Sequence, residues 1–194
     1  MYIAIEGIDT AGKSTQISEL KKNYPDAVIT KEPGATEIGK EIREIVLSAR
    51  AQSKKAEFLL FLADRAEHLK EVIEPNLDKM IISDRSAVSG VAYALIQGEI
   101  SKEDLVSLNN FATNNTYPEK VFLLRLTKEE LEYRLSQKEL DGIELRGSEY
   151  LLNIQDAIIE AAKLLNLELV EIDATKKIDE ITKEILNNMK DIND

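Results

Sequence analysis

Short apolar runs alternate along the chain with longer stretches in which apolar residues recur at every third or fourth position. The runs show little alternation of apolar and polar residues, which is typical of strands buried on both faces. Strands that alternate with helices indicate a parallel sheet covered by helices on both faces. The pattern therefore predicts an α/β fold with a five-stranded parallel sheet, whose strands we place at residues 2–5, 27–30, 80–83, 121–126 and 168–172.

The helical stretches are bounded by recognisable start and stop signals. Ser101 and Thr127 are each followed three residues later by an acidic residue, the spacing of a capping box at a helix start. Apolar residues at helical spacing predict one helix before Pro25, another after Gly34, and a long one that ends at Pro75.

The length and composition fit a single domain over residues 1–194. A chain of 194 residues buries about 70% of the surface that its unfolded form exposes. Hydrophobic residues make up 43% of the chain and charged residues 31%, and no apolar run approaches the roughly 18 residues of a membrane span. The first residues, MYIAIEG, have no basic segment and no long apolar core, so we expect no secretory signal.

Charge and cysteine content narrow the classes of function. The 25 Lys and Arg against 36 Asp and Glu leave a formal net charge of −11, which disfavours a nucleic acid polymer as partner. A small anion can still bind where a few cations converge in a cleft, because salt screens the distant acidic residues. The absence of cysteine excludes thiol nucleophiles, Cys-based zinc sites and disulfides, and it fits a cytoplasmic location.

The segment GIDTAGKST follows the first predicted strand and opens a predicted helix. Gly7, Gly12, Lys13 and Ser14 in it fit the pattern G-x-x-x-x-G-K-[ST], a loop whose backbone N–H groups wrap around phosphate oxygens. We expect Lys13 to reach the β- and γ-phosphates of a nucleoside triphosphate and Ser14 to ligate Mg²⁺. The predicted nucleotide-binding residues are Gly7, Ile8, Asp9, Thr10, Ala11, Gly12, Lys13, Ser14 and Thr15.

A second candidate site follows the predicted strand MIIS. Asp84 stands at the carboxyl end of this strand, where a carboxylate can organise Mg²⁺ directly or through water. Arg85 comes next and is expected to point into the same cleft. An Asp–Arg pair in a simple turn is the alternative interpretation.

Two observations separate the classes of nucleotide-binding protein. A GTPase switch needs D-x-x-G, but Ala87 stands three residues after Asp84, and the segment from Lys176 to Asp179 lacks the Asn of the guanine motif. A helicase-like ATPase needs a basic surface, which the net charge of −11 opposes. We therefore expect transfer of the γ-phosphoryl group to a small anionic acceptor.

Phe61 and Arg65 lie four residues apart in a predicted helix and so share one face. An aromatic plane beside a planar donor fork suits a flat heterocycle with carbonyl oxygens. Packing of Phe61 in the core is the alternative, and these two residues alone leave both interpretations open.

The sequence resembles the thymidylate kinases, which are nucleoside monophosphate kinases of the P-loop NTPase type, almost from end to end. The segments that carry this resemblance are IEGIDTAGKST at 5–15, TKEPGATEIGKEIR at 30–43, AEFLLFLADRAEH at 56–68, SDRSAVSGVAY at 83–93 and a lid-like RLSQKELDGIE at 134–144.

The resemblance implies a reaction and an assembly. It implies transfer of phosphate from Mg·ATP to dTMP, giving dTDP and ADP, by a homodimer whose subunits have a short mobile lid at about 134–147. Another pyrimidine nucleotide or deoxynucleoside kinase of the same fold is an alternative, and a non-catalytic ATP-binding regulator is a second.

The resemblance also implies roles for individual residues. Phe61 would stack on thymine, Arg65 would hydrogen-bond its carbonyl, and Tyr93 would close beneath the deoxyribose. The remaining implied roles are an acceptor-phosphate clamp of Arg43 and Arg85, a contact of Asp9 with the 3′-hydroxyl and metal, a base edge at Ser89 and Gly90, and an acceptor loop shaped by Glu32 and Pro33.

Some positions depart from the family pattern. Thr10 stands where one subtype of the family has a catalytic Arg. Members without that Arg usually compensate with a lid rich in arginine; here the lid has Arg134, Lys138 and Arg146, and we expect Lys138 at the compensating position. The catalytic set is thus Lys13, Arg85, Asp9 and Lys138. No general base is expected, because an acceptor phosphate oxygen is already ionised. The single histidine, His68, is expected on the surface of its helix.

Overall fold

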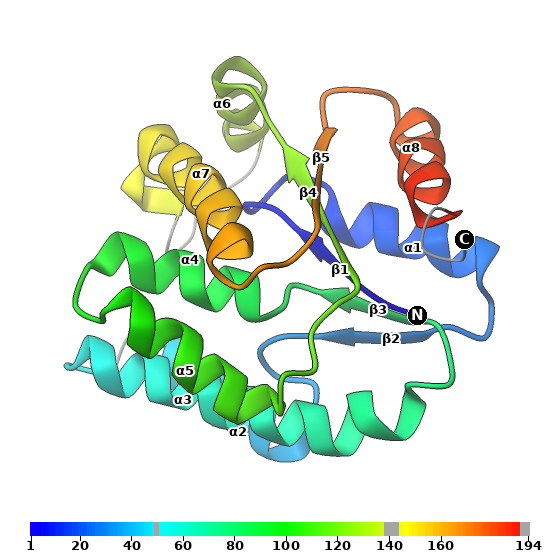
Figure 1. Cartoon of the computed structure of the whole chain (residues 1–194). Helices are drawn as coiled ribbons and strands as arrows, with labels where there is room; N and C mark the ends of the chain where they lie inside the picture. The colour runs from blue at the N-terminus through cyan, green and yellow to red at the C-terminus, as the bar shows by residue number, and fades with distance from the viewer. Residues whose placement is uncertain (49–50, 138–143, 191–194) are drawn as a thin grey trace.

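The computed structural model describes residues 1–48, 51–137 and 144–190, and its centre is a five-stranded parallel β-sheet (Figure 1). The predicted α/β fold is confirmed, and each strand end lies within one residue of its prediction. The strands are β1 (Tyr2–Glu6), β2 (Val28–Lys31), β3 (Ile81–Asp84), β4 (Lys120–Arg125) and β5 (Leu169–Asp173), in the spatial order β2-β3-β1-β4-β5.

Burial depends on the place of each strand in the sheet. Every residue of β1 is buried, as are the first five residues of β4. The edge strands β2 and β5 are each only partly buried. An edge strand is less buried because it has one neighbouring strand instead of two. The apolar runs therefore predicted the positions of these two strands correctly but overestimated their burial.

Helices cover both faces of the sheet. Figure 1 shows α1 and α8 on one face, where they pack against each other, and α4 and α7 on the opposite face, with α3 and α5 packed beyond α4. The α-helices in the described residues are α1 (Lys13–Asn23), α2 (Glu37–Leu47), α3 (Lys54–His68), α4 (Ala87–Gln97), α5 (Lys102–Thr113), α6 (Lys128–Ser136), α7 (Ser148–Leu164) and α8 (Ile178–Lys190). None of these helices is long and apolar enough to cross a membrane.

The predicted helix starts are confirmed, whereas one predicted helix is interrupted. The hydroxyls of Ser101 and Thr127 accept hydrogen bonds from backbone N–H groups three residues later and cap α5 and α6. The long helix expected to reach Pro75 is regular only as far as His68, and it continues as a π-helical turn, η1 (Leu69–Ile73), and a 3₁₀ turn, η2 (Glu74–Asn76). Proline has no N–H to donate, so a regular helical ladder cannot pass through it.

The strand order creates the crevice in which a ligand can bind. The chain runs from β1 to β2 and β3 on one side of the sheet, then crosses to β4 and β5 on the other side of β1. Ligands in open α/β sheets bind at the carboxyl ends of the strands beside such a switch. Here Asp84 is paired in register with Ile5 and Lys31, which brings the ends of β3, β1 and β2 together.

Candidate active site

A cavity of about 930 Å³ opens at the carboxyl ends of β1, β2 and β3. It is lined by residues from the β1–α1 loop, the β2–α2 loop, the end of β3 and the second half of α4, segments that lie far apart in the sequence. The predicted site residues that line it are Asp9, Thr10, Gly12, Lys13, Ser14, Thr15, Glu32, Arg43, Asp84, Arg85 and Tyr93. Gly7, Ile8 and Ala11 belong to the same loop but are buried beneath it.

The β1–α1 loop has the backbone that a phosphate cradle requires. Gly7 and Gly12 have φ values of +152° and +96°, which disfavour any residue with a Cβ. A Cβ on Gly7 would also lie only 3.1 Å from the carbonyl oxygen of Leu124. Gly12 is the residue before α1, so the N-terminal end of this helix lies at the cavity. The N–H groups of its first turn have no partner within the helix and can bind an anion there.

Lys13 is held inside this loop. Its Nζ donates to the carbonyl oxygens of Gly7 at 3.0 Å and Ile8 at 3.2 Å, and the residue is 8% exposed. Burial, together with the positive charge of Arg85, lowers the pKa of Lys13 to about 8. The ammonium group therefore titrates close to physiological pH.

The residues expected to organise Mg²⁺ lie at one end of the cavity. Ser14 is exposed and lines it, and Asp84 lines it from the end of β3. Asp84 Oδ1 is buried and has no hydrogen-bond partner in the described part of the chain. A buried carboxylate oxygen without a donor suits a cation or a water molecule that the cation holds. The described residues contain no cluster of three or more His, Cys, Asp or Glu side chains that could hold a metal ion.

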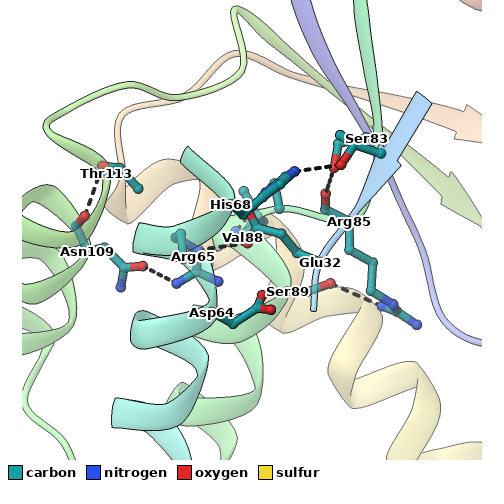
Figure 2. A network of polar contacts seen from close by, with 12 residues as sticks. Glu32, Asp64, Arg65, His68, Ser83, Arg85, Val88, Ser89, Asn109 and Thr113 are labelled. Carbon is teal, nitrogen blue, oxygen red and sulfur yellow. Dashed lines mark hydrogen bonds and ion pairs between the residues drawn. The ribbon is translucent and has the colours of Figure 1, made fainter. Parts of the chain in front are cut away.

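Arg85 lines the cavity together with residues of the phosphate loop, and Figure 2 shows its side chain reaching Ser89. Its backbone has φ +70°, an uncommon conformation for a residue other than glycine. The guanidinium donates to Asp9 Oδ1 at 3.0 Å and to Ser89 Oγ at 3.0 Å. Asp9 lies on β1's loop and Ser89 on α4, so Arg85 is oriented from two sides.

Glu6 is a buried carboxylate that the sequence analysis did not select. It is 0% exposed, and it accepts hydrogen bonds from the hydroxyls of Ser86 at 2.8 Å and Ser89 at 2.5 Å. Burial raises its pKa, and the positive charge of Arg85 partly offsets that effect. An acidic residue at the end of an otherwise apolar strand was the signal that would have pointed to it.

The β2–α2 loop faces the phosphate loop across the cavity. Arg43 donates to the carbonyl oxygen of Pro33 at 2.9 Å, and the Glu32–Pro33 peptide bond is cis. The N–H of Gly34 donates to Asp64 of α3 at 2.9 Å. The loop is therefore fixed to α3 while the Arg43 side chain lines the cavity.

Lys13 of the phosphate loop and the guanidinium groups of Arg43 and Arg85 thus line one cavity. A family model described as thymidylate kinase matches residues 5–185 of the chain. The chain belongs to the thymidylate kinase family. It is 75% identical over 189 residues to the thymidylate kinase of Sulfurimonas denitrificans, covering 97% of this chain and 99% of that one. It is 55% identical over 185 residues to the thymidylate kinase of Aliarcobacter butzleri, covering 95% and 96%.

A solved structure shares the fold. The crystal structure of thymidylate kinase from Ehrlichia chaffeensis superposes with a TM-score of 0.72 at 26% identity, and the match covers 98% of both chains. The resemblance seen in the sequence motifs is therefore confirmed, and so is the P-loop fold of this kinase family.

Five of the residues that the family resemblance assigned to the acceptor site do not line the cavity. They are Phe61 and Arg65 of α3, Pro33 of the β2–α2 loop, and Ser89 and Gly90 of α4. Arg65 is 3% exposed; its Nε donates to Glu32 Oε2 at 2.8 Å and its NH1 to Asn109 Oδ1 at 2.6 Å.

The prediction that His68 lies on the helix surface is wrong. His68 is 0% exposed and contacts Thr30 Oγ1 through Nε2 at 2.6 Å and Glu32 Oε1 through Nδ1 at 2.9 Å. Helix α3 carries Asp64, Arg65 and His68 on its buried side. Residues three and four apart share a face, and this spacing was the signal that could have placed His68 beside Arg65.

The lid residues fall into three cases. Lys138, the expected lid cation, lies outside the described residues. Arg134 of α6 donates to Thr10 O at 3.0 Å, Ala174 O at 2.8 Å and Glu130 Oε1 at 2.7 Å, and so ties the phosphate loop to the β5–α8 turn. Arg146 lines the cavity, and its guanidinium lies 4.9 Å from the ring centroid of Tyr150.

The residues that line the cavity without having been selected in the sequence analysis include Lys54, Glu57 and Gln97. Lys54 and Gln97 both donate to the carboxylate of Glu57, at 2.8 Å and 3.3 Å. They join α3 to the end of α4. Lys54 and Glu57 have the spacing of an ordinary surface ion pair, so nothing in the sequence marked them.

Proposed function

We propose that this chain transfers the γ-phosphoryl group of Mg·ATP to dTMP and forms dTDP and ADP. The observation that carries the proposal is that a phosphate loop and two further cations, Arg43 and Arg85, line the same cavity. Phosphoryl transfer between two phosphates needs such a site, because the protein must align two anions and neutralise the charge between them.

On the donor side, the proposed ATP site is the loop from Gly7 to Thr15. Lys13 breaks its contacts with the carbonyl oxygens of Gly7 and Ile8 and pairs with the β- and γ-phosphates instead. Ser14 and Asp84 are the residues that would hold Mg²⁺, directly or through water. The ion supplies positive charge to the phosphates of the donor.

On the acceptor side, Arg43 and Arg85 bind the phosphate of dTMP. Asp9 orients Arg85 through their 3.0 Å contact and reaches the sugar 3′-hydroxyl and the metal site. Tyr93 stays a neutral phenol, because burial raises its pKa to about 12, and it packs beneath the deoxyribose. Base recognition by Phe61 and Arg65, with the edge of Ser89 and Gly90 and the loop of Glu32 and Pro33, completes the proposed acceptor site.

No residue is needed as a general base. The attacking oxygen of dTMP belongs to a phosphate that is ionised at neutral pH, so nucleophile activation is a matter of position and charge. A lid cation is expected to stabilise the transferring group. Lys138 is the proposed residue from the family pattern, and Arg146 is a second candidate because it lines the cavity.

A second copy of the chain is the proposed partner, and a cytoplasmic location is part of the same proposal. Helix α3 exposes an apolar stripe of Ala56, Leu59, Ala63 and Ala66 on the side opposite its buried charges. Leu59 is 55% exposed, and Phe111 of the adjacent helix α5 is 83% exposed. Contiguous exposed apolar residues on packed helices are typical of a protein interface.

The experiment that tests the function measures ADP production from Mg·ATP with dTMP, dUMP, dCMP, UMP, dGMP, dAMP and thymidine offered separately, beside a control without acceptor. We expect strong turnover with dTMP, weaker turnover with dUMP and negligible turnover with the others. Preference for another monophosphate or for thymidine would favour the kinase alternative. ATP binding without turnover on any acceptor would favour the regulator.

A further inference from the structure

His68 is a buried histidine for which the proposed reaction has no direct use. It is 0% exposed, and its ring extends from the end of α3 toward Glu32 (Figure 2). A fully buried imidazole must satisfy both ring nitrogens. It does so with Thr30 of β2 and with Glu32, the first residue of the acceptor loop.

In the hydrogen bond between His68 and Glu32, the imidazole is the donor and the carboxylate is the acceptor. Burial alone would raise the pKa of Glu32, but the charge of Arg65 and the hydrogen bond from His68 lower it to about 2. Glu32 is therefore a carboxylate, which only accepts hydrogen bonds. Nδ1 of His68 must carry a hydrogen and donate it to Glu32 Oε1, while Thr30 Oγ1 can pair with the other nitrogen as donor or acceptor.

The two oxygens of Glu32 have separate partners. Oε1 accepts from His68 at 2.9 Å, and Oε2 accepts from Nε of Arg65 at 2.8 Å. Because each oxygen accepts from a different residue, the plane of the carboxylate is fixed, and with it the orientation of the Arg65 guanidinium. Without His68, Oε1 would be a buried oxygen with no donor, and a rotation of the carboxylate to find one would release Arg65.

Arg65 is oriented at two of its three nitrogens. Glu32 holds Nε, and Asn109 holds NH1 at 2.6 Å. The third nitrogen, NH2, lies against Gly90, since a Cβ added there would be 2.9 Å from it. The guanidinium is therefore directed toward the segment of α4 that contains the proposed base edge, Ser89 and Gly90.

We propose that His68 is a positioning residue for acceptor recognition, which acts through Glu32 on Arg65. The inference rests on the proposed function, because it assumes that Arg65 reads the base of the acceptor. A positioning role of this kind affects binding of dTMP. It leaves the ATP side of the cavity unchanged because, in the described part of the chain, no hydrogen bond or ion pair joins the phosphate loop to His68, Glu32 or Arg65. Of the two hydrogen-bond contacts of the imidazole, the one with Glu32 is the one that affects binding of the acceptor.

A matched pair of variants separates these contacts. The amide nitrogen of Asn occupies about the place of Nδ1, so His68→Asn keeps a donor for Glu32, whereas the longer side chain of His68→Gln places its amide near Nε2 and Thr30. We expect His68→Gln to raise KM for dTMP roughly tenfold, with kcat and KM for ATP within about twofold of wild type. His68→Asn should change KM for dTMP by less than about threefold.

A double variant tests the route through Arg65. If His68 acts through this residue, His68→Gln should have little further effect on KM for dTMP when Arg65→Lys is already present. Equal effects of His68→Gln and His68→Asn, equal changes in kcat and in both KM values, or additivity with Arg65→Lys would each overturn the proposal. Melting temperatures of the variants report the purely structural cost of losing the ring.

A measurement on the wild-type protein needs no substitution. The chain has one histidine, so its imidazole signals are unambiguous in proton and nitrogen NMR spectra. We expect a downfield, slowly exchanging Nδ1–H signal that shifts on addition of dTMP and is unchanged by ADP. A ring without hydrogen on Nδ1, or a signal insensitive to dTMP, would contradict the proposal. Wild-type turnover with dTMP is measured in the same series, so a failure of the proposed function is seen separately.

Discussion

Lys13 is the residue on which the donor side of the cavity depends most, and its chemistry is set by its surroundings. The loop carbonyl oxygens of Gly7 and Ile8 satisfy the ammonium group, but burial and the charge of Arg85 lower its pKa to about 8. Only the charged form can pair with the phosphates of ATP. The residue is therefore poised so that a small rise in pH removes the charge on which binding depends.

The first prediction concerns the pH dependence of this lysine. Since its pKa is lowered, the free enzyme loses the charge as pH rises through about 8, and kcat/KM for ATP should fall above that pH. Bound phosphates favour the charged form, so kcat should stay constant to higher pH. Lys13→Arg should be slower but lack the step, and Lys13→Ala should have negligible turnover at every pH with its fold intact. A constant kcat/KM up to pH 10 would refute the assignment.

The second prediction concerns Gly90. A Cβ at this position would lie 2.9 Å from NH2 of Arg65, and Arg65 cannot move freely because Glu32 and Asn109 hold it. Gly90→Ala should therefore raise KM for dTMP roughly tenfold, while KM for ATP, measured on the same preparation, should be unaffected. Unchanged affinity for dTMP would mean that Arg65 does not read the acceptor.

At the scale of elements, the cavity exists because parallel strands bring their carboxyl ends to one edge of the sheet. Helix α6 adds a less obvious connection, since Arg134 joins it to the phosphate loop through Thr10 and to the end of β5 through Ala174. Arg134 and Arg146 both lie in the predicted lid segment. Arg134 has three hydrogen-bond partners, whereas the hydrogen bond and the cation–π contact of Arg146 are both with Tyr150.

The third prediction separates these arginines. Arg134→Ala removes three hydrogen bonds, one of them to a carboxylate, and should lower the free energy of unfolding by about 2 kcal/mol. Arg146→Ala is the matched control and should leave the melting temperature unchanged. Lys138→Ala should reduce kcat far more than it changes the affinity for dTMP. If Arg146→Ala reduces kcat in that way and Lys138→Ala does not, Arg146 is the lid cation.

At the scale of the whole molecule, α3 carries ionisable residues on its buried side and apolar residues on its exposed side. Its buried side has Asp64, Arg65 and His68 beside the core residues Phe58 and Leu62, and its exposed side has Ala56, Leu59, Ala63 and Ala66. The buried charges are compensated within the subunit by the β2–α2 loop and by α5. The exposed stripe is compensated by nothing in the described chain, and this is why we expect a second copy to cover it.

The fourth prediction tests that interface. Leu59→Glu places a charge in the stripe and should convert a dimer into a monomer in sedimentation or light-scattering measurements at micromolar concentration. Leu77→Glu, at a leucine that is 49% exposed outside α3, is the matched control and should leave the dimer intact. A wild-type protein that sediments as a monomer would exclude the proposed partner.

Local patterns in the sequence were sufficient for the strands, for the capped helix starts and for the phosphate loop. Each of these depends on neighbouring residues: apolar runs, a hydroxyl three residues before an N–H, or two glycines and a lysine at fixed spacing. The family motifs extended this to Arg43, Arg85 and Tyr93, which do line the cavity. In these cases the chemistry of a short segment is nearly independent of the rest of the chain.

Several features of the site depend on tertiary structure. They are the burial of His68, the pairing of Glu32 with Arg65, the hydrogen bond from Arg134 to Thr10, and the position of the Glu6 carboxylate near Arg85. These contacts join residues that are 33 to 124 positions apart in the sequence. Helical periodicity shows that Arg65 and His68 share a face, but the order of strands in the sheet decides what that face meets. A buried polar group is stable only beside its partners, and those partners are supplied by packing between elements.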